Sequence, residues 1–334
     1  MQKGQYEEPV SIIIAARNEY QNLKKLLPQL YAQEHPDFEI IIVNDQSYDE
    51  TYDFLKAESA SNPRLRVVNV DNAPDHVNSK KFALTLGIKA AKNDLLLLTD
   101  ADCLPNSNQW VSTMASHASD KQFVIGFSQY ETKPGFLNYF IRFETLLTGI
   151  QYLSFAALGK PYMGVGRNLA YRKSLFLENK GFNGYMQVVG GDDDLFVNKH
   201  ATNKNTAVVA GSEAETTSIP KTTWKSFFKQ KLRHLSVGKH YKTGDKIILG
   251  SFSLSYLLSW LLLPILLIAG GELYLVIGSF LLRSLLFYIT FLISTKKLNV
   301  TFNVWGLIFL ELIYVFYYIF IAVRALFTKR VTWS

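Results

Sequence analysis

The sequence predicts an α/β fold: a Rossmann-like, mainly parallel sheet flanked by helices, followed by interfacial helices and a C-terminal bundle of about three transmembrane helices. Hydrophobic periods of two and of 3.6 residues alternate along the first half of the chain, which is the pattern of βαβ units. After Lys246, long apolar stretches replace that alternation. The chain has 334 residues, 48% of them hydrophobic, enough for one large domain or two ordinary ones.

The alternation places each element in order. Strands are expected at 10–16, 38–44, 64–70, 94–99 and 123–127, and helices at 19–33, 49–58 and 79–91. The first strand ends in Ala15-Ala16-Arg17-Asn18-Glu19, which lacks the Gly-x-Gly-x-x-Gly loop of dinucleotide-binding folds. The sequence contains no Gly-Lys-Ser/Thr phosphate loop either. A Rossmann dehydrogenase is therefore disfavoured.

The stretch Leu95–Leu98 is apolar on both faces, which is typical of a central strand in a parallel sheet. It runs directly into Thr99-Asp100-Ala101-Asp102. Ligands of open α/β sheets collect beyond the carboxyl ends of the strands, so Asp100 and Asp102 are expected at the mouth of a site. Carboxylates at this spacing suit Mg²⁺ or Mn²⁺ carried by a diphosphate. The alternative is an ordinary turn or helix cap, where Asp-x-Asp also occurs.

The apolar excess lies towards the C-terminal end. No charged residue occurs between Lys246 and Glu272, and two further apolar stretches follow, each long enough to cross about 30 Å of hydrocarbon. The N-terminal residues lack the apolar region of a secretory signal, so the first domain is expected in the cytosol. We expect a cytosolic catalytic domain over 1–220, a basic amphipathic interfacial segment over 221–246 and a transmembrane region over 247–334, with spans at about 247–270, 273–295 and 300–323.

The segment 221–246 carries eight Lys and Arg residues against one acidic residue, interleaved with aromatic side chains. This composition is typical of a helix on an anionic membrane surface. A net charge of +7 also suits nucleic acid, but the neighbouring apolar span favours the bilayer, and no nucleic-acid partner is expected. Phe136–Leu158 is a second candidate for an interfacial helix, with packing against the core as the alternative.

Basic residues before the first span place the catalytic domain on the cytoplasmic side of the inner membrane, in a multi-pass protein. Three crossings would put the C-terminal end outside, which Lys329 and Arg330 oppose. Either the positive-inside rule is overridden, or one of the three segments is re-entrant and does not cross the membrane.

Two charges interrupt the last two apolar segments. Arg283 and Glu311 are equidistant in sequence from Lys297, so a hairpin would bring them to a similar depth, where an unpaired charge is costly. We predict that they pair; the alternative is that Arg283 binds a lipid headgroup phosphate.

Several motifs occur in a fixed order between residues 10 and 240. They are Val10–Glu19, Val43–Thr51, Lys80 with Ala83-Leu84, Thr99–Asp102, Gly191-Asp192-Asp193-Asp194-Leu195 and Gln230-Lys231-Leu232-Arg233-His234. In this order they resemble the landmarks of family-2 glycosyltransferases. The resemblance implies a GT-A fold, a nucleotide-sugar donor and inversion at the anomeric carbon.

The resemblance also implies a donor pocket. Asp45 matches the residue that contacts the nucleoside, with a helix cap as the alternative. Lys80 lies near a helix start, where its ammonium would meet a phosphate. A solvated surface lysine is the alternative, and Lys81 is the other candidate. The residues assigned to this pocket are Ala15, Arg17, Glu19, Asp45, Lys80, Asp100, Ala101 and Asp102.

The acidic run is expected to supply the general base. In the family the base lies three residues before the leucine of this motif, which selects Asp192, with Asp193 as runner-up. The alternative is a solvated helix start. Asp102, supported by Asp100, would hold the cation that stabilises the departing diphosphate. The stretch with Gly166, Arg167 and Asn168 resembles the family's border with the acceptor.

The Gln230 motif departs from its family. Gln230 and Arg233 share a helix face, so an amide and a guanidinium together suit a diphosphate. His234 replaces the usual Trp, so a stacking platform becomes a smaller, titratable ring.

The sequence thus predicts a membrane-anchored, inverting, metal-assisted glycosyltransferase. It would transfer a sugar from a nucleotide diphosphate, with UDP as the expected nucleotide, to a lipid or membrane-associated glycan. The alternatives are a processive polysaccharide synthase subunit, a non-catalytic nucleotide-sugar-binding assembly protein, and a glycosidase, which would need no basic diphosphate grip. The one cysteine, Cys103, excludes an intramolecular disulfide framework and a multi-cysteine metal site.

Overall fold

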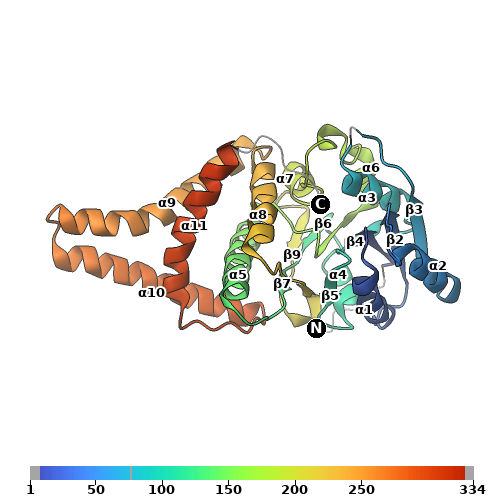
Figure 1. Cartoon of the computed structure of the whole chain (residues 1–334), viewed down its shortest axis with the longest axis horizontal. Coiled ribbons are helices and arrows are strands. Elements are labelled where there is room, and N and C mark those ends of the chain that lie inside the picture. The colour runs from blue at the N-terminus through green and yellow to red at the C-terminus, as the bar shows by residue number, and fades with distance from the viewer. Residues whose placement is uncertain (1–7, 76, 328–334) are drawn as a thin grey trace. The chain divides into compact units, whose positions relative to one another are not determined.

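The computed structural model describes residues 8–75 and 77–327, in two compact units (Figure 1). The first unit comprises residues 1–131 and 151–220, and the second comprises 132–150 and 221–334. The N-terminal residues that precede Glu8 lie outside the described residues, as do Lys329 and Arg330.

The first unit is built on a mainly parallel sheet, as predicted. Its central strands are parallel, in the order β3 (Leu65–Val70), β2 (Phe38–Asp45), β1 (Val10–Ala16) and β4 (Leu95–Leu98). Beyond β4 the sheet continues with β8 (Leu169–Arg172), which is antiparallel to β4, and then β6 (Phe123–Ile125) and β9 (Thr206–Val208). A smaller sheet contains β5 (Cys103–Pro105), β10 (Thr216–Ser218) and β7 (Ser128–Tyr130). The short helices of this unit are α2 (Thr51–Ser61), α6 (Lys173–Glu178), α7 (Asp194–His200), η1 (Asn183–Tyr185) and η2 (Ser212–Ala214).

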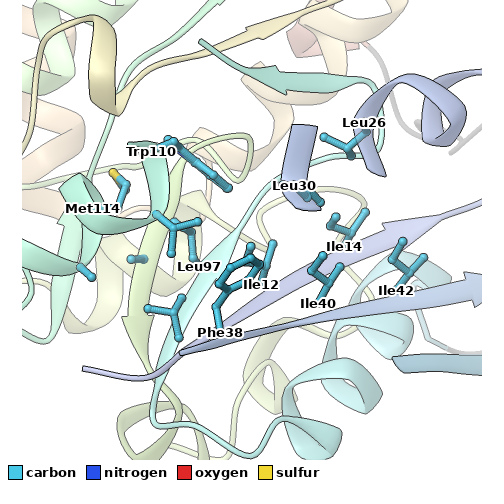
Figure 2. Packing of buried hydrophobic residues seen from close by; sticks show 14 of the residues in the cluster. Ile12, Ile14, Leu26, Leu30, Phe38, Ile40, Ile42, Leu97, Trp110 and Met114 are labelled. Carbon is cyan, nitrogen blue, oxygen red and sulfur yellow. The ribbon is translucent and has the colours of Figure 1, made fainter. Parts of the chain in front are cut away.

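Alternating side chains of the strands form a core on one face of the sheet. Leu26 and Leu30 of α1 (Tyr20–Tyr31) and Trp110 and Met114 of α4 (Trp110–Ser116) cover this face. Figure 2 shows them packed with Ile12, Ile14, Phe38, Ile40, Ile42 and Leu97. Each buried side chain of this size contributes about 1.5–3 kcal/mol, which fixes the strand ends that carry the site.

Helix α3 (Ser79–Ala90) lies close to β1 and β2 at Gly87. A Cβ at Gly87 would lie 2.8 Å from Val43 Cγ2 and 3.1 Å from Ile13 Cγ2. The glycine therefore permits a close approach that sets the height of the α3 start, where Lys80 and Lys81 lie.

The second unit is helical. It contains the first part of α5 (Phe136–Ala157), then α8 (Trp224–Gly238), α9 (Thr243–Ile268), α10 (Leu273–Lys297) and α11 (Leu307–Phe327). Among the described residues, α9, α10 and α11 are long and apolar enough to cross a membrane. In the apolar stripe of α5, Phe140 and Phe143 are buried. Phe140 contacts Trp224, Phe227 and Tyr317. This stripe therefore packs against other helices of the protein, as the alternative to an interfacial helix expected.

The ion pair predicted between the last two apolar segments is present. Arg283 of α10 forms an ion pair with Glu311 of α11, whose side chain is almost fully buried. The prediction that these two charges pair is confirmed.

Candidate active site

The loops after β1 and β2 are fastened to each other at the carboxyl edge of the sheet. Asn18 N donates to Ser47 Oγ at 2.9 Å, Tyr48 N donates to Asn18 Oδ1 at 2.9 Å, and Glu19 N donates to Thr51 Oγ1 at 3.0 Å. Asn18 adopts a left-handed backbone, with φ +56°, which an Asn tolerates better than most residues. The two strand ends therefore form one rigid rim.

The expected nucleoside residues follow this rim. Ala15 pairs in register with Val43, two residues before Asp45. Asp45 is buried and accepts a hydrogen bond of 2.9 Å from Gln46 Nε2. Arg17 is exposed, whereas the Glu19 carboxylate accepts from Asn22 Nδ2 at 2.6 Å. Strand pairing thus brings this set to one edge, and its contact with a nucleoside stays a prediction.

A cluster of metal-ligand atoms follows β4. One ligand atom each from Asp100, Asp102 and Cys103 lies within 4.8 Å of the others. The Cys103 thiol donates to Asp102 Oδ1 at 3.4 Å, and burial raises the thiol pKa well above its usual value. Cys103 therefore stays a protonated donor, and the two carboxylates are the ligands that fit a hard cation. Ala101, which separates the two aspartates in the sequence, is buried.

Lys80 joins this cluster to the acidic motif. Its Nζ lies 2.9 Å from Asp100 Oδ1 and 3.2 Å from Asp192 Oδ2. Burial opposes the charge, but Asp100 and Asp192 outweigh it and raise the pKa of Lys80 above its usual value. A solvated surface lysine, the alternative for this residue, is therefore incorrect.

The two leading carboxylates of the acidic motif have different surroundings. Asp193 Oδ2 accepts from Gly166 N at 2.6 Å and Oδ1 accepts from Asp194 N at 2.7 Å, so Asp193 caps α7. Burial and the neighbouring Asp192 raise the pKa of Asp193. Burial also opposes ionisation of Asp192, but Lys80 outweighs it and lowers the pKa of Asp192.

Lys81 holds the segment that leads into this motif. Its fully buried ammonium donates to the carbonyl oxygens of Tyr185, Val188 and Gly190, at 3.0, 2.5 and 2.6 Å. All three N–H groups of the lysine are thereby used. The sequence marks Lys81 only as a second lysine at a helix start, and its partners more than a hundred residues away could not be read locally.

The residues of the expected acceptor border, Gly166, Arg167 and Asn168, are buried or half-buried. The Cζ atom of the Arg167 guanidinium lies 4.5 Å from the centroid of the Tyr130 ring. The backbone carbonyl of Arg167 accepts a hydrogen bond of 3.0 Å from Thr99 Oγ1. The Asn168 side chain is fully buried and bonds to Trp110, Phe127 and Ala214. Asn168 therefore supports this loop from inside, while Gly166 is also buried and Arg167 is half-buried.

The Gln230 motif lies in α8, in the second unit. Gln230 and Arg233 are half-buried and His234 is exposed, while the intervening Lys231 forms an ion pair with Glu144. A contact between these side chains and a diphosphate at Asp102 stays a prediction.

Comparison with known proteins gives a consistent family. The model described as glycosyl transferase family 2 matches residues 11–179, and that described as glycosyl transferase family group 2 matches residues 97–326. The chain belongs to glycosyl transferase family 2.

Two curated relatives are similar over about a third of this chain. The 4,4'-diaponeurosporenoate glycosyltransferase of Staphylococcus haemolyticus is 32% identical over 36% of this chain and 31% of its own length. The undecaprenyl-phosphate 4-deoxy-4-formamido-L-arabinose transferase of Pseudomonas syringae is 32% identical over 35% of this chain and 34% of its own length. The matched part is thus about a third of each relative.

A solved structure supports the fold over nearly the whole chain. It is the mannosyltransferase PcManGT of Pyrobaculum calidifontis in complex with GDP-Man and Mn²⁺, with a TM-score of 0.62 and 18% identity. The match covers 97% of this chain and 89% of that one. At this identity the likeness confirms the expected fold class.

Proposed function

We propose that this protein is an inverting glycosyltransferase that transfers a sugar from a nucleotide diphosphate to a lipid or membrane-associated glycan. The observation that carries the proposal is the position of Lys80 between Asp100 and Asp192. A diphosphate at the end of β4 would compete for this ammonium and free Asp192. Asp192 would then accept the proton of the acceptor hydroxyl as its oxygen attacks the anomeric carbon and the bond to the diphosphate breaks.

The carboxylates after β4 suit a divalent cation. Asp102 and Asp100 would hold Mg²⁺ or Mn²⁺, and the remaining ligands would come from the diphosphate and water. Bound there, the cation would stabilise negative charge on the leaving diphosphate. Ala15, Arg17, Glu19 and Asp45 would hold the nucleoside, with UDP as the proposed nucleotide, and Gln230, Arg233 and His234 would complete the diphosphate grip.

The acceptor is proposed to be a lipid presented at the cytoplasmic face of the inner membrane. Apolar helices follow the first unit, which we call the catalytic unit, and the names of the two curated relatives refer to 4,4'-diaponeurosporenoate and to undecaprenyl phosphate. Gly166 and Arg167 would face that acceptor. A processive polymer synthase is the second candidate, because a poly-beta-1,6-N-acetyl-D-glucosamine synthase of Staphylococcus epidermidis is 35% identical over 29% of this chain.

The test is product formation in membranes with and without the protein. Membranes would receive a panel of UDP- and GDP-linked sugars with Mn²⁺, and their lipids would be analysed by mass spectrometry. One sugar added to one lipid supports the proposal, a ladder of sugars supports the processive alternative, and no new product with any donor contradicts both. Hydrolysis of a glycan without any nucleotide sugar would indicate a glycosidase.

A further inference from the structure

The second unit contains three apolar helices, yet their contacts distinguish one from the other two. The inference rests on the proposed membrane anchoring. We infer that α9 and α10 cross the bilayer as a hairpin, whereas α11 enters the membrane without crossing it, so that its C-terminal end returns to the side of α8.

Helices α9 and α10 form an antiparallel hairpin with its turn at Gly270 and Gly271. Trp260 packs on Phe280 at 5.1 Å, and farther from the turn Tyr256 packs on Phe287 at 6.3 Å. Side chains on the outside of the hairpin are exposed hydrocarbon, including Leu254, Ile265, Leu275, Leu281 and Leu285. Such a surface suits lipid tails, and each helix is long enough to cross them.

Helix α8 marks the side from which the hairpin enters. Lys225, Lys229 and Arg233 lie on a helix whose other face carries the buried Phe227. A helix of this kind lies at the membrane surface and does not cross the hydrocarbon. Because α9 begins at Thr243, just after α8, the open end of the hairpin lies at the same surface.

The contacts of α11 run in the wrong direction for a third crossing. Glu311, near the start of α11, pairs with Arg283, midway along the hairpin. Seven residues later, Tyr318 Oη donates to Ser253 Oγ at 2.9 Å, nearer the open end. In the last turn of α11, Ala325 O accepts a hydrogen bond of 3.3 Å from Lys239 Nζ. Lys239 lies at the junction of α8 and α9. A crossing helix would move away from that junction.

The start of α11 lies at the open end as well. Phe302 packs on Phe291 of α10 at 5.4 Å, and Tyr139 of α5 donates to Asn303 O at 2.5 Å. Helix α11 also runs beside α8, since Tyr317 and Phe320 contact Phe227 and Phe228. Figure 1 shows α11 lying across the open side of the arms formed by α9 and α10. Both described ends of α11 are therefore on the surface that carries α8.

The experiment uses single cysteines in the full chain and a maleimide that does not cross membranes. Cys103, the one cysteine of the natural sequence, is buried, so labelling of the unaltered chain gives the background signal. Ser119→Cys reports the side of the catalytic unit, Glu272→Cys reports the hairpin turn, and Ser334→Cys reports the C-terminal end, with Thr332→Cys as a second position there. Each is labelled in intact cells and in inverted vesicles.

We expect Glu272→Cys to react in intact cells, and Ser119→Cys, Ser334→Cys and Thr332→Cys to react in inverted vesicles. Reaction of Ser334→Cys and Thr332→Cys in intact cells would show a third crossing and overturn the inference. Reaction of all positions on one side would overturn the hairpin too. Labelling needs no turnover, so a failed activity assay leaves this result readable.

Discussion

The Gly166 backbone N–H donates to Asp193 Oδ2 at 2.6 Å, which ties the loop before β8 to the start of α7. The other oxygen of Asp193 accepts from Asp194 N. Both oxygens of the Asp193 carboxylate therefore accept hydrogen bonds from the backbone. Asp192, one residue earlier, instead faces the Lys80 ammonium. We therefore propose a structural role for Asp193 and keep Asp192 as the proposed base.

Asparagine at each position should separate these roles. Asp192→Asn should lower kcat about 10²–10⁴-fold, because an amide cannot accept the proton, and should lower the unfolding temperature as well, because Lys80 loses one of its two carboxylate partners. Asp193→Asn should cost about 1 kcal/mol of stability through its weakened cap, with a smaller loss of kcat. Transfer assays and thermal unfolding in detergent measure both, with Asp194→Asn as the control. Full turnover in Asp192→Asn together with an inactive, stable Asp193→Asn would reverse the assignment.

Lys81→Met should loosen the segment 185–190. Methionine fills the space but removes three donors, and each buried carbonyl left unpaired costs about 1–3 kcal/mol. We expect faster hydrogen exchange in this segment and a lower kcat, with a smaller change in the KM of the donor. Lys89→Met, an exposed lysine on the same helix, is the control. Unchanged exchange in Lys81→Met would contradict this role.

Metal removal should stop transfer. Excess EDTA should abolish product formation, and Mn²⁺ or Mg²⁺ added back should restore it, since the Asp100 and Asp102 carboxylates suit a hard cation. Asp102→Asn should require a higher metal concentration for half-maximal rate than the wild type. Full activity in EDTA, with no metal recovered in the protein by elemental analysis, would argue for a cation-independent site.

Local pattern was sufficient for the alternating strands and helices from β1 to β4. The bounds predicted for Val10–Ala16 match those observed, because an apolar run that is interrupted by one small serine and followed by polar residues indicates a buried strand. Strand β8 could not be placed this way. It inserts antiparallel between β4 and β6, and such pairing depends on contacts between distant segments.

The position of a candidate site residue was predictable where it depends on a strand end, as for Asp100 and Asp102. It was not predictable where the role depends on distant partners. Asn168 lies in a glycine-containing loop typical of a ligand site, yet its amide is consumed by Trp110 and two carbonyl groups. Composition likewise makes α11 a candidate span, and only its contacts with α8 and α9 indicate another course.

Glu215 should make the stability of the catalytic unit depend on pH. The side chain is fully buried, and burial raises its pKa from 4.5 to about 7, with Gly211 N as a hydrogen-bond donor at 3.4 Å. The folded state therefore binds this proton more tightly than the unfolded chain. Its stabilising contribution is complete below pH 4.5 and is lost as the pH rises through about 7, by up to about 3 kcal/mol.

Glu215→Gln tests this linkage, because glutamine cannot ionise. Thermal unfolding at pH 5 and pH 8 should show a fall in the wild type and a smaller fall in the variant, which should be the more stable of the two at pH 8. An equal fall in both would place the pH dependence elsewhere.

Charge reversal tests whether the Arg283–Glu311 pair is an interaction between two helices or a lipid-phosphate site. Arg283→Glu and Glu311→Arg should each destabilise by about 3–5 kcal/mol, because each leaves two like charges buried together. The double exchange should recover most of that loss, since it restores an ion pair at the same depth. Recovery of monodisperse protein in detergent and its unfolding temperature provide the readout, with Glu272→Arg at the exposed turn as a matched single reversal. If Arg283 instead served a lipid phosphate, Glu311→Arg would be tolerated, and the double exchange would be as unstable as Arg283→Glu alone.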